Sequence, residues 1–179
     1  MIFLTADTHF SHEGIIKHAQ RGFASVEEMN RSLVEKWNEV VLRERDEVWV
    51  LGDFAFARKG FDLHELFWAL RGVKHLVVGN HDEKNPAVLR LPWESVQHLK
   101  MLKAPGGDGR AVLCHYPMES WSQSHHGALH FHGHSHGTMR KAPRRFDVGW
   151  DVWKRPVPFD ELLELGLKET WFPTDHHGA

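Results

Sequence analysis

The 179 residues of this chain are enough to bury the core of one domain, and we expect a single domain over residues 1–179. Basic residues number 22 and acidic residues 24, and the formal net charge of −2 excludes nucleic-acid binding that relies on strong overall positive charge. The single cysteine excludes an internal disulfide, and no apolar run approaches the roughly 20 residues of a membrane span, so we expect a cytoplasmic protein without a membrane partner.

The start of the chain predicts a buried strand that ends at residue types able to bind metal. Residues 2–4 form an apolar run, and Asp7 and His9 follow it. Two residues apart on an extended strand end, these side chains would point to the same face and bind one ion, although such a pair is also common in surface loops. Residues 25–41 then begin with capping-box spacing and carry one apolar face, which predicts a helix.

The pattern of a buried strand followed by polar donors occurs twice more. Residues 48–51 lead into Asp53, and residues 76–78 lead into residues 79–82, which read Gly-Asn-His-Asp. A carboxylate has two oxygens, so Asp53 is the natural bridge between two ions, with a simple turn aspartate as the alternative. An amide, a histidine and an acid directly after a strand are hard to explain by packing alone. Asp62 predicts the start of a helix between the two strands.

The second half of the chain is richer in strand-like runs than the first. The predicted strands are residues 96–102, 111–114, 129–131 and 145–150. Residues 106–109, which read Gly-Gly-Asp-Gly, predict a hairpin turn between the first two of them. A last helix is expected over residues 159–165, ended by Gly166.

Several of the sixteen histidines follow these later strands. His115 comes directly after one run, and alone it would more often be a core or rim residue than a ligand. Residues 133–137 read Gly-His-Ser-His-Gly and are the strongest single block, because the glycines let the backbone approach closely. His130 and His132 extend the pattern of a histidine at every second position toward the N-terminus, and we interpret them as structural or supporting residues.

Together the blocks supply oxygen and imidazole donors without a thiolate. Such donors suit Mn²⁺, Fe or Zn²⁺, and also Ni²⁺, better than they suit a sulfur-rich structural zinc site. The donors are about twice as many as one tetrahedral ion needs, so we expect two divalent ions per chain, with Mn²⁺ as the first candidate. The expected metal ligands are Asp7, His9, Asp53, Asn80, His115, His134 and His136.

The ordered set of blocks resembles the calcineurin-like metallophosphoesterase superfamily. The match runs from residue 7 to residue 136, and residues 7–12, 113–118 and 132–137 resemble its small bacterial and phage members. The resemblance implies an α/β fold in which two mixed β-sheets are flanked by helices in a four-layer αββα sandwich. It also implies an assignment of ligands: Asp7, His9 and His136 to a first ion, Asn80, His115 and His134 to a second, and Asp53 as the bridge.

The resemblance further implies hydrolysis of phosphate esters by a metal-bridging hydroxide. His81 would assist the leaving oxygen, and Asp82 would orient His81. The chain lacks the two arginines with which protein phosphatases of this fold clamp a phosphate dianion, so a phosphodiester derived from a nucleotide or nucleic acid is the more plausible substrate. A phosphomonoesterase and a non-catalytic protein-binding scaffold on the same fold are the alternatives. The complete set of ligand types favours catalysis.

Four further residues are candidate substrate contacts. His12 and Tyr116 lie next to metal-ligand blocks and are expected to border the pocket. Arg144 and Arg145 belong to a basic segment over residues 140–145 that would form a phosphate-binding rim. A solvated basic loop is an equally good interpretation of this segment.

Overall fold

The computed structural model describes residues 1–56, 60–104, 107 and 109–170. Its strands are β1 (Ile2–Thr5), β2 (Glu47–Val50), β3 (Val73–Val77), β4 (Ser95–Gln97), β5 (Leu99–Lys103), β6 (Arg110–Cys114), β7 (Leu129–His132), β8 (Arg145–Asp147) and β9 (Val157–Pro158). Its helices are α1 (Glu13–His18), α2 (Val26–Val40), α3 (Leu63–Ala69), α4 (Pro86–Leu89), the 3-10 turn η1 (Ser124–His126), α5 (Trp150–Trp153) and α6 (Phe159–Leu167).

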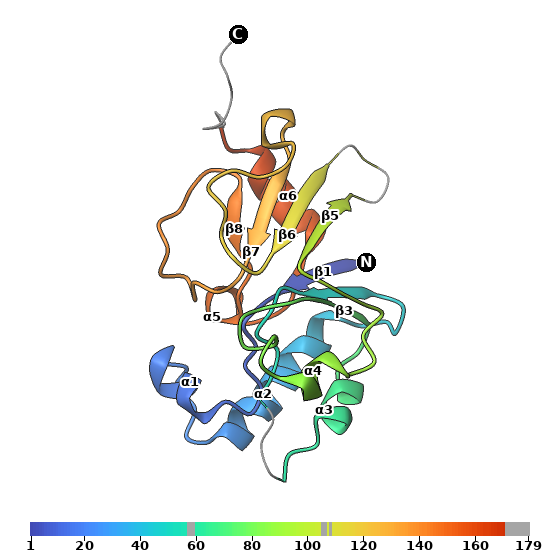
Figure 1. Ribbon diagram of the computed structural model, residues 1–179, viewed down its shortest axis with the longest axis vertical. Helices are drawn as coiled ribbons and strands as arrows, with labels where there is room; N and C mark the ends of the chain where they lie inside the picture. Colours follow the sequence, from blue (N-terminus) through green and yellow to red (C-terminus); the bar gives the residue numbers. More distant parts are fainter. Residues whose placement is uncertain (57–59, 105–106, 108, 171–179) are drawn as a thin grey trace.

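Two mixed β-sheets form the centre of the molecule, and helices flank them (Figure 1). The first sheet has the strand order β4-β3-β2-β1-β9, in which only β9 runs antiparallel to its neighbour. The second has the order β5-β6-β7-β8, in which β5 is antiparallel to β6 and the other pairs are parallel. The predicted α/β class with two mixed sheets flanked by helices is therefore confirmed.

Helices α2 and α3 cover the outer face of the first sheet. The Ser25 hydroxyl oxygen accepts the Glu28 N–H at the start of α2, as its capping-box spacing predicts, and Asp62 caps α3 in the same way. Met29, Leu33 and Trp37 on one face of α2 are fully buried in the core between helix and sheet. Among the residues described, no helix has both the length and the apolar character needed to span a membrane.

The two sheets pack against each other through their inner faces. Leu4 and Leu51 from the first sheet share a buried cluster with Leu113 and Phe131 from the second, and α6 contributes Leu162 to the same cluster. The carboxyl ends of β1, β2, β3, β6 and β7 lie along one common edge. This edge carries the polar blocks that the sequence places after these five strands.

The outer face of the second sheet is covered by a loop. Val112 and His130 on this face pack against Trp121 and Ala128 from the segment that connects β6 to β7. Within the described part of that segment, η1 is the only helical turn. The segment that packs on this face is thus largely irregular.

Three predicted element boundaries are wrong. Residues 96–102 are divided between β4 and β5, because the chain leaves the first sheet at His98 and enters the second. The strand predicted to reach residue 150 ends at Asp147, because the Asp147 carboxylate accepts the Gly149 N–H in a turn that starts α5. Gly166 lies inside α6, where a Cβ would be 2.6 Å from Leu129 side-chain carbons, so its role is close packing and not helix termination.

The predicted hairpin is confirmed in its strands, since β5 and β6 pair antiparallel. Of its predicted turn over residues 106–109, Gly106 and Asp108 lie outside the described residues.

Candidate metal centre

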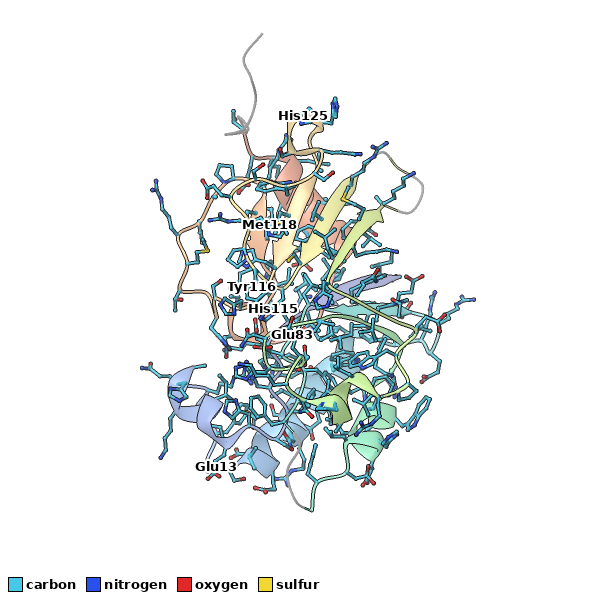
Figure 2. All side chains as sticks on the ribbon, viewed as in Figure 1. Glu13, Glu83, His115, Tyr116, Met118 and His125 are labelled. Carbon is cyan, nitrogen blue, oxygen red and sulfur yellow. The ribbon has the colours of Figure 1, made fainter. Side chains whose placement is uncertain are left out.

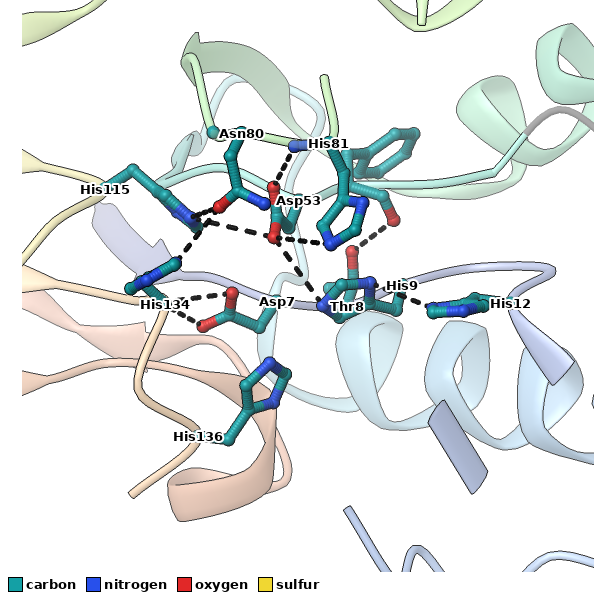
Figure 3. A network of polar contacts seen from close by, with 12 residues as sticks. Asp7, Thr8, His9, His12, Asp53, Asn80, His81, His115, His134 and His136 are labelled. Carbon is teal, nitrogen blue, oxygen red and sulfur yellow. Dashed lines mark hydrogen bonds and ion pairs between the residues drawn. The ribbon is translucent and has the colours of Figure 1, made fainter. Parts of the chain in front are cut away.

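Loops that leave the carboxyl ends of five strands meet at one edge of the two sheets (Figure 3). The His134 N–H donates to the Asp7 carboxylate at 2.9 Å, and the Trp150 N–H donates to the Ala6 carbonyl oxygen at 2.8 Å, so the edge spans both sheets. This is where sheets of α/β proteins bind ligands. All predicted ligands lie here: Asp7 and His9 after β1, Asp53 after β2, Asn80 after β3, His115 after β6, and His134 and His136 after β7.

Asp7, His9 and His136 form a first group, with ligand atoms that all lie within 4.8 Å of one another. The rings of His9 and His136 stack with their centroids 5.2 Å apart. The prediction that Asp7 and His9 face a common point agrees with this grouping, but its geometric reason is wrong. Strand β1 ends at Thr5, and Asp7 and His9 have φ angles of 53° and 51°. Their shared direction therefore comes from a turn of left-handed residues and not from an extended strand.

Asn80, His115 and His134 form a second group. The Asn80 side-chain oxygen lies 3.0 Å from His115 Nε2 and 3.0 Å from His134 Nδ1 (Figure 3). Three donor atoms from three different loops thus converge on one point. The His115 ring is fixed from behind, because its Nδ1 lies 2.8 Å from the Leu51 carbonyl oxygen.

Asp53 lies between the two groups. Its Oδ2 atom is 3.8 Å from His9 Nε2 in the first group and 3.6 Å from His115 Nε2 in the second. The Asp53 side chain is only 3% exposed, and its Oδ1 atom accepts the His81 N–H at 2.9 Å. Asp7 also comes within 4.8 Å of both Asp53 and His115 through its ligand atoms. Asp53 therefore lies within 4 Å of one imidazole nitrogen from each group.

Backbone strain is concentrated in this cluster. Five of the predicted ligands have left-handed φ angles between 47° and 67°: Asp7, His9, Asp53, His134 and His136. A non-glycine residue in this region costs on the order of 1–3 kcal/mol and persists only where the surrounding structure holds it. Backbone strain of this kind clusters at functional sites, where the required position of a side chain outweighs the cost of an unfavourable φ angle.

Glycine is required at two positions that face the cluster. A Cβ at Gly52, whose φ is +86°, would lie 2.3 Å from His115 Nδ1. A Cβ at Gly79 would lie 2.4 Å from Asp53 Oδ1. The residues that precede Asp53 and Asn80 are therefore glycines because the β2 and β3 loops approach each other too closely for any side chain.

The electrostatics of the cluster fit bound cations. Burial raises the pKa of Asp7 well above its usual range, and the neighbouring carboxylates of Asp53 and Asp147 raise it further. Burial lowers the pKa of His9 well below its usual range, with the positive charge of Arg21 as a second cause. The neutral ring leaves His9 Nε2 buried without a hydrogen-bond partner. Crowded carboxylates and a buried imidazole nitrogen without a hydrogen-bond partner are groups that a divalent metal ion would satisfy.

Asp82 holds the backbone of the loops after β2 and β3 and not the His81 ring. Its buried carboxylate accepts the N–H groups of Asp53, Phe54 and Gly79 at 2.7, 3.0 and 2.9 Å. The prediction that Asp82 orients His81 is therefore wrong, because backbone donors from the β2 and β3 loops occupy both carboxylate oxygens. Burial raises the pKa of Asp82 to about 6, although the N–H donors oppose this rise.

His81 lies beside the cluster and is held by other rings. Its side chain is 41% exposed, and its Nε2 atom is 3.8 Å from Asp53 Oδ2. The ring contacts Phe56 and His9 with centroid distances of 5.0 and 5.4 Å. His12, a predicted substrate contact, stacks on Phe56 with centroids 3.9 Å apart. His81 thus combines access to solvent with a position next to the Asp53 carboxylate, and His12 borders the same side of the site.

Tyr116, the other predicted contact from a metal-ligand block, lies at the rim beside the second group. Its ring centroid is 5.0 Å from that of His115 and 4.9 Å from that of His134, and the residue is 43% exposed (Figure 2). An open groove extends from His134 and His136. Its walls come from α1 and from the loops after β6 and β7: Ile15, His18, Ala19, Pro117, Thr138 and Met139.

Arg144 and Arg145 do not border the site, so the prediction of a phosphate-binding rim is wrong. They stand at the amino end of β8, and parallel β7 and β8 direct only their carboxyl ends toward the ligands. The Arg145 side chain is 5% exposed and donates to the carbonyl oxygens of Met118 and Arg140. The Arg144 guanidinium lies beside Gly127, next to η1, whose His125 marks the far end of the second sheet (Figure 2).

Arg145→Met is expected to lower stability and to leave nucleic-acid binding unchanged. Methionine retains much of the packing but leaves two carbonyl oxygens without their donor, which should cost about 1–3 kcal/mol of unfolding free energy. Denaturant titration measures this loss, and Arg140→Gln at a neighbouring exposed position serves as the control. Weaker oligonucleotide binding by fluorescence anisotropy, at unchanged stability, would restore the rim interpretation.

His130 and His132 have structural roles, in agreement with the interpretation made from the sequence. His130 Nε2 accepts the Met118 N–H at 3.0 Å, and its Nδ1 atom lies 3.0 Å from the Val112 carbonyl oxygen. His132 Nδ1 lies 2.8 Å from the Gly133 carbonyl oxygen. The His130 contacts tie β7 to β6 and to the loop after it, and the His132 contact is local to the end of β7.

Two residues behind the first group were missed by reasoning from the sequence. Arg21 lies after α1 and Asp151 lies in α5, and neither belongs to a block that resembles a known motif. Asp151 contacts His136, and Arg21 contacts Asp151 and the backbone at Asp7. Only their position in space connects them with the ligands.

Comparisons with known proteins give relatives but no named activity. No protein-family model matches the chain. The gene 66 protein of Mycobacterium phage D29 is 30% identical over 92% of this chain and 94% of its own length. An uncharacterized protein of Methanocaldococcus jannaschii is 34% identical over 92% of this chain and 90% of its own length. The crystal structure of a protein of unknown function from Aquifex aeolicus, 23% identical, shares the fold with a TM-score of 0.74 over 92% of this chain and 98% of that one.

Proposed function

We propose that this chain, which belongs to one family with the phage gene 66 protein and the Methanocaldococcus jannaschii protein, is a two-metal phosphoesterase that prefers phosphodiesters. The observation that carries the proposal is the position of Asp53 between two groups of donors. The arrangement of the two sheets, with every ligand after a strand, supports a metallophosphoesterase-like fold. Nucleotides and nucleic-acid ends are the substrates we expect.

The residues present fit two divalent ions, with Mn²⁺ as the first candidate. Asp7, His9 and His136 would hold one, Asn80, His115 and His134 the other, and Asp53 would touch both. Bound there, the ions would acidify a water molecule and neutralise charge on the phosphate oxygens. The oxygen and nitrogen donors, without sulfur, agree with this choice of metals.

We assign to His81 the transfer of a proton to the leaving group. Its partly exposed ring can reach a substrate atom, while Phe56 and His9 restrict its orientation. A leaving oxygen that departs as an alkoxide needs a proton, and a histidine at this position can donate it. Asp82 contributes indirectly by fixing the loops that carry Asp53 and Asn80.

The surroundings of the site favour a diester over a monoester. A phosphate monoester is a dianion near neutral pH and is best bound by a guanidinium group in addition to metal ions. Arg21 approaches the ligands, but its side chain is 1% exposed and its donors are taken up by Asp151 and by the carbonyl oxygens of Asp7 and Thr8. It is therefore unavailable to a substrate, and a diester monoanion fits better.

We expect metal removal to abolish activity and lower thermal stability, because ions that bind only the folded state stabilise it. Chelator-treated protein should be inactive and melt at a lower temperature, and Mn²⁺ should restore both. At saturation, elemental analysis should find two ions per chain. Bis(nitrophenyl) phosphate should be cleaved faster than nitrophenyl phosphate. One ion at saturation would contradict the two-metal site, and two ions without turnover of any linear or cyclic diester would favour the non-catalytic scaffold.

A further inference from the structure

Arg21 and Asp151 form a buried ion pair directly behind the first group of ligands. The Arg21 Nε and Nη2 atoms donate to the two Asp151 carboxylate oxygens, both at 2.9 Å. The two side chains are 1% and 6% exposed. Such a paired arrangement of two hydrogen bonds fixes the orientation of both groups as well as their distance.

Each member of the pair also contacts the candidate metal centre. Asp151 Oδ2 lies 2.7 Å from His136 Nδ1. A carboxylate only accepts hydrogen bonds, so His136 Nδ1 carries the proton and Nε2 retains the lone pair. The Arg21 Nη atoms donate to the carbonyl oxygens of Asp7 and Thr8 at 2.6 and 2.7 Å. One ion pair therefore touches the ligand histidine after β7 and the strained turn after β1.

We infer that Asp151 and Arg21 are positioning residues for the first metal ion, Asp151 through the His136 tautomer and Arg21 through the backbone that carries Asp7 and His9. This inference rests on the proposed function. Histidines that bind metals commonly donate their second ring N–H to a carboxylate, and loss of that partner typically lowers metal affinity about 10–100-fold.

Asp151→Asn tests this role by metal binding, without recourse to turnover. Titration calorimetry with Mn²⁺ should show one of the two binding steps weakened about 10–100-fold and the other retained. Electron paramagnetic resonance at two equivalents of Mn²⁺ should change from a coupled pair to a single-ion signal plus free Mn²⁺. Lys154→Gln is the matched control, because Lys154 Nζ lies 3.6 Å from Asp151 Oδ1 but is 53% exposed, and its loss should change neither step.

Arg21→Lys is the second variant, since it keeps the charge and loses the paired hydrogen bonds. It should weaken the same binding step in protein that still folds, as judged by circular dichroism of the metal-free chain. Two binding steps unchanged in both variants would overturn the inference and leave the proposed function standing. Absence of Mn²⁺ binding by the unsubstituted protein would overturn both. Loss of folding in both variants, or equal loss of both ions, would assign the pair a purely structural role.

Discussion

Asp53→Asn is expected to abolish binding of at least one metal ion and to lower kcat/KM at least about 10³-fold, which corresponds to several kcal/mol of transition-state stabilisation. Asparagine has nearly the same shape and can still accept the His81 N–H through its one oxygen. It carries no charge, however, and with its one oxygen on the His81 N–H it places an NH₂ group where Asp53 Oδ2 faces both groups. The loss should therefore come from the metal centre and not from the fold.

Metal content, turnover and thermal stability of the metal-free chain measure the effect of Asp53→Asn. Metal-free protein should melt at or above the temperature of the unsubstituted chain, because the substitution relieves repulsion between the Asp53 and Asp7 carboxylates. Asp160→Asn, on the exposed first turn of α6, removes a carboxylate far from the ligands and should change neither metal content nor turnover. An active Asp53→Asn enzyme with two ions would contradict the bridging role.

His81→Ala is expected to retain both ions and to lose activity in proportion to how much the leaving oxygen needs a proton. A nitrophenolate carries its developing charge with little help, whereas an alkoxide from a nucleoside or alkyl ester does not. General acid catalysis contributes about 10²–10⁴-fold where protonation is needed. Activity on nucleoside or alkyl diesters should fall by this factor, and activity on nitrophenyl esters should fall far less.

Asn80→Ala is the matched comparison for His81→Ala, since Asn80 is the adjacent residue and a proposed ligand. It removes the oxygen that lies 3.0 Å from both His115 and His134. Metal affinity should fall, and both classes of substrate should lose activity together. If His81→Ala lost metal, or reduced cleavage of both leaving groups equally, its role as proton donor would be wrong.

The elements that carry the candidate site were predictable because their signals are local. Each ligand follows a short apolar run, and a buried strand with a polar residue after its end can be recognised within about ten residues. The carboxyl ends of parallel strands share an edge, which is why these residues meet in the folded chain. All predicted ligands lie together at that edge, including Asp53 between the two groups.

The errors in the predicted site concern residues whose partners are distant in the chain. Asp82 lies beside His81 in sequence, but its oxygens accept N–H groups from Asp53 and Phe54, almost thirty residues away. Arg145 belongs to a basic segment that reads as a solvated surface, yet its guanidinium is buried against the loop after β6. The neighbours of a residue in the sequence therefore do not determine the direction in which the folded backbone points its side chain.

The sequence by itself therefore determined which strands precede the predicted ligands and the order in which these residues follow them. Only the tertiary structure decided what supports them: the Arg21–Asp151 pair joins residues 130 positions apart, and the two sheets bring His134 against Asp7 across 127 positions. Hydrophobic periodicity and capping are encoded within a few residues, because they depend on backbone geometry and local burial. Hydrogen bonds between loops depend on how two packed sheets are placed, and no local pattern encodes that placement.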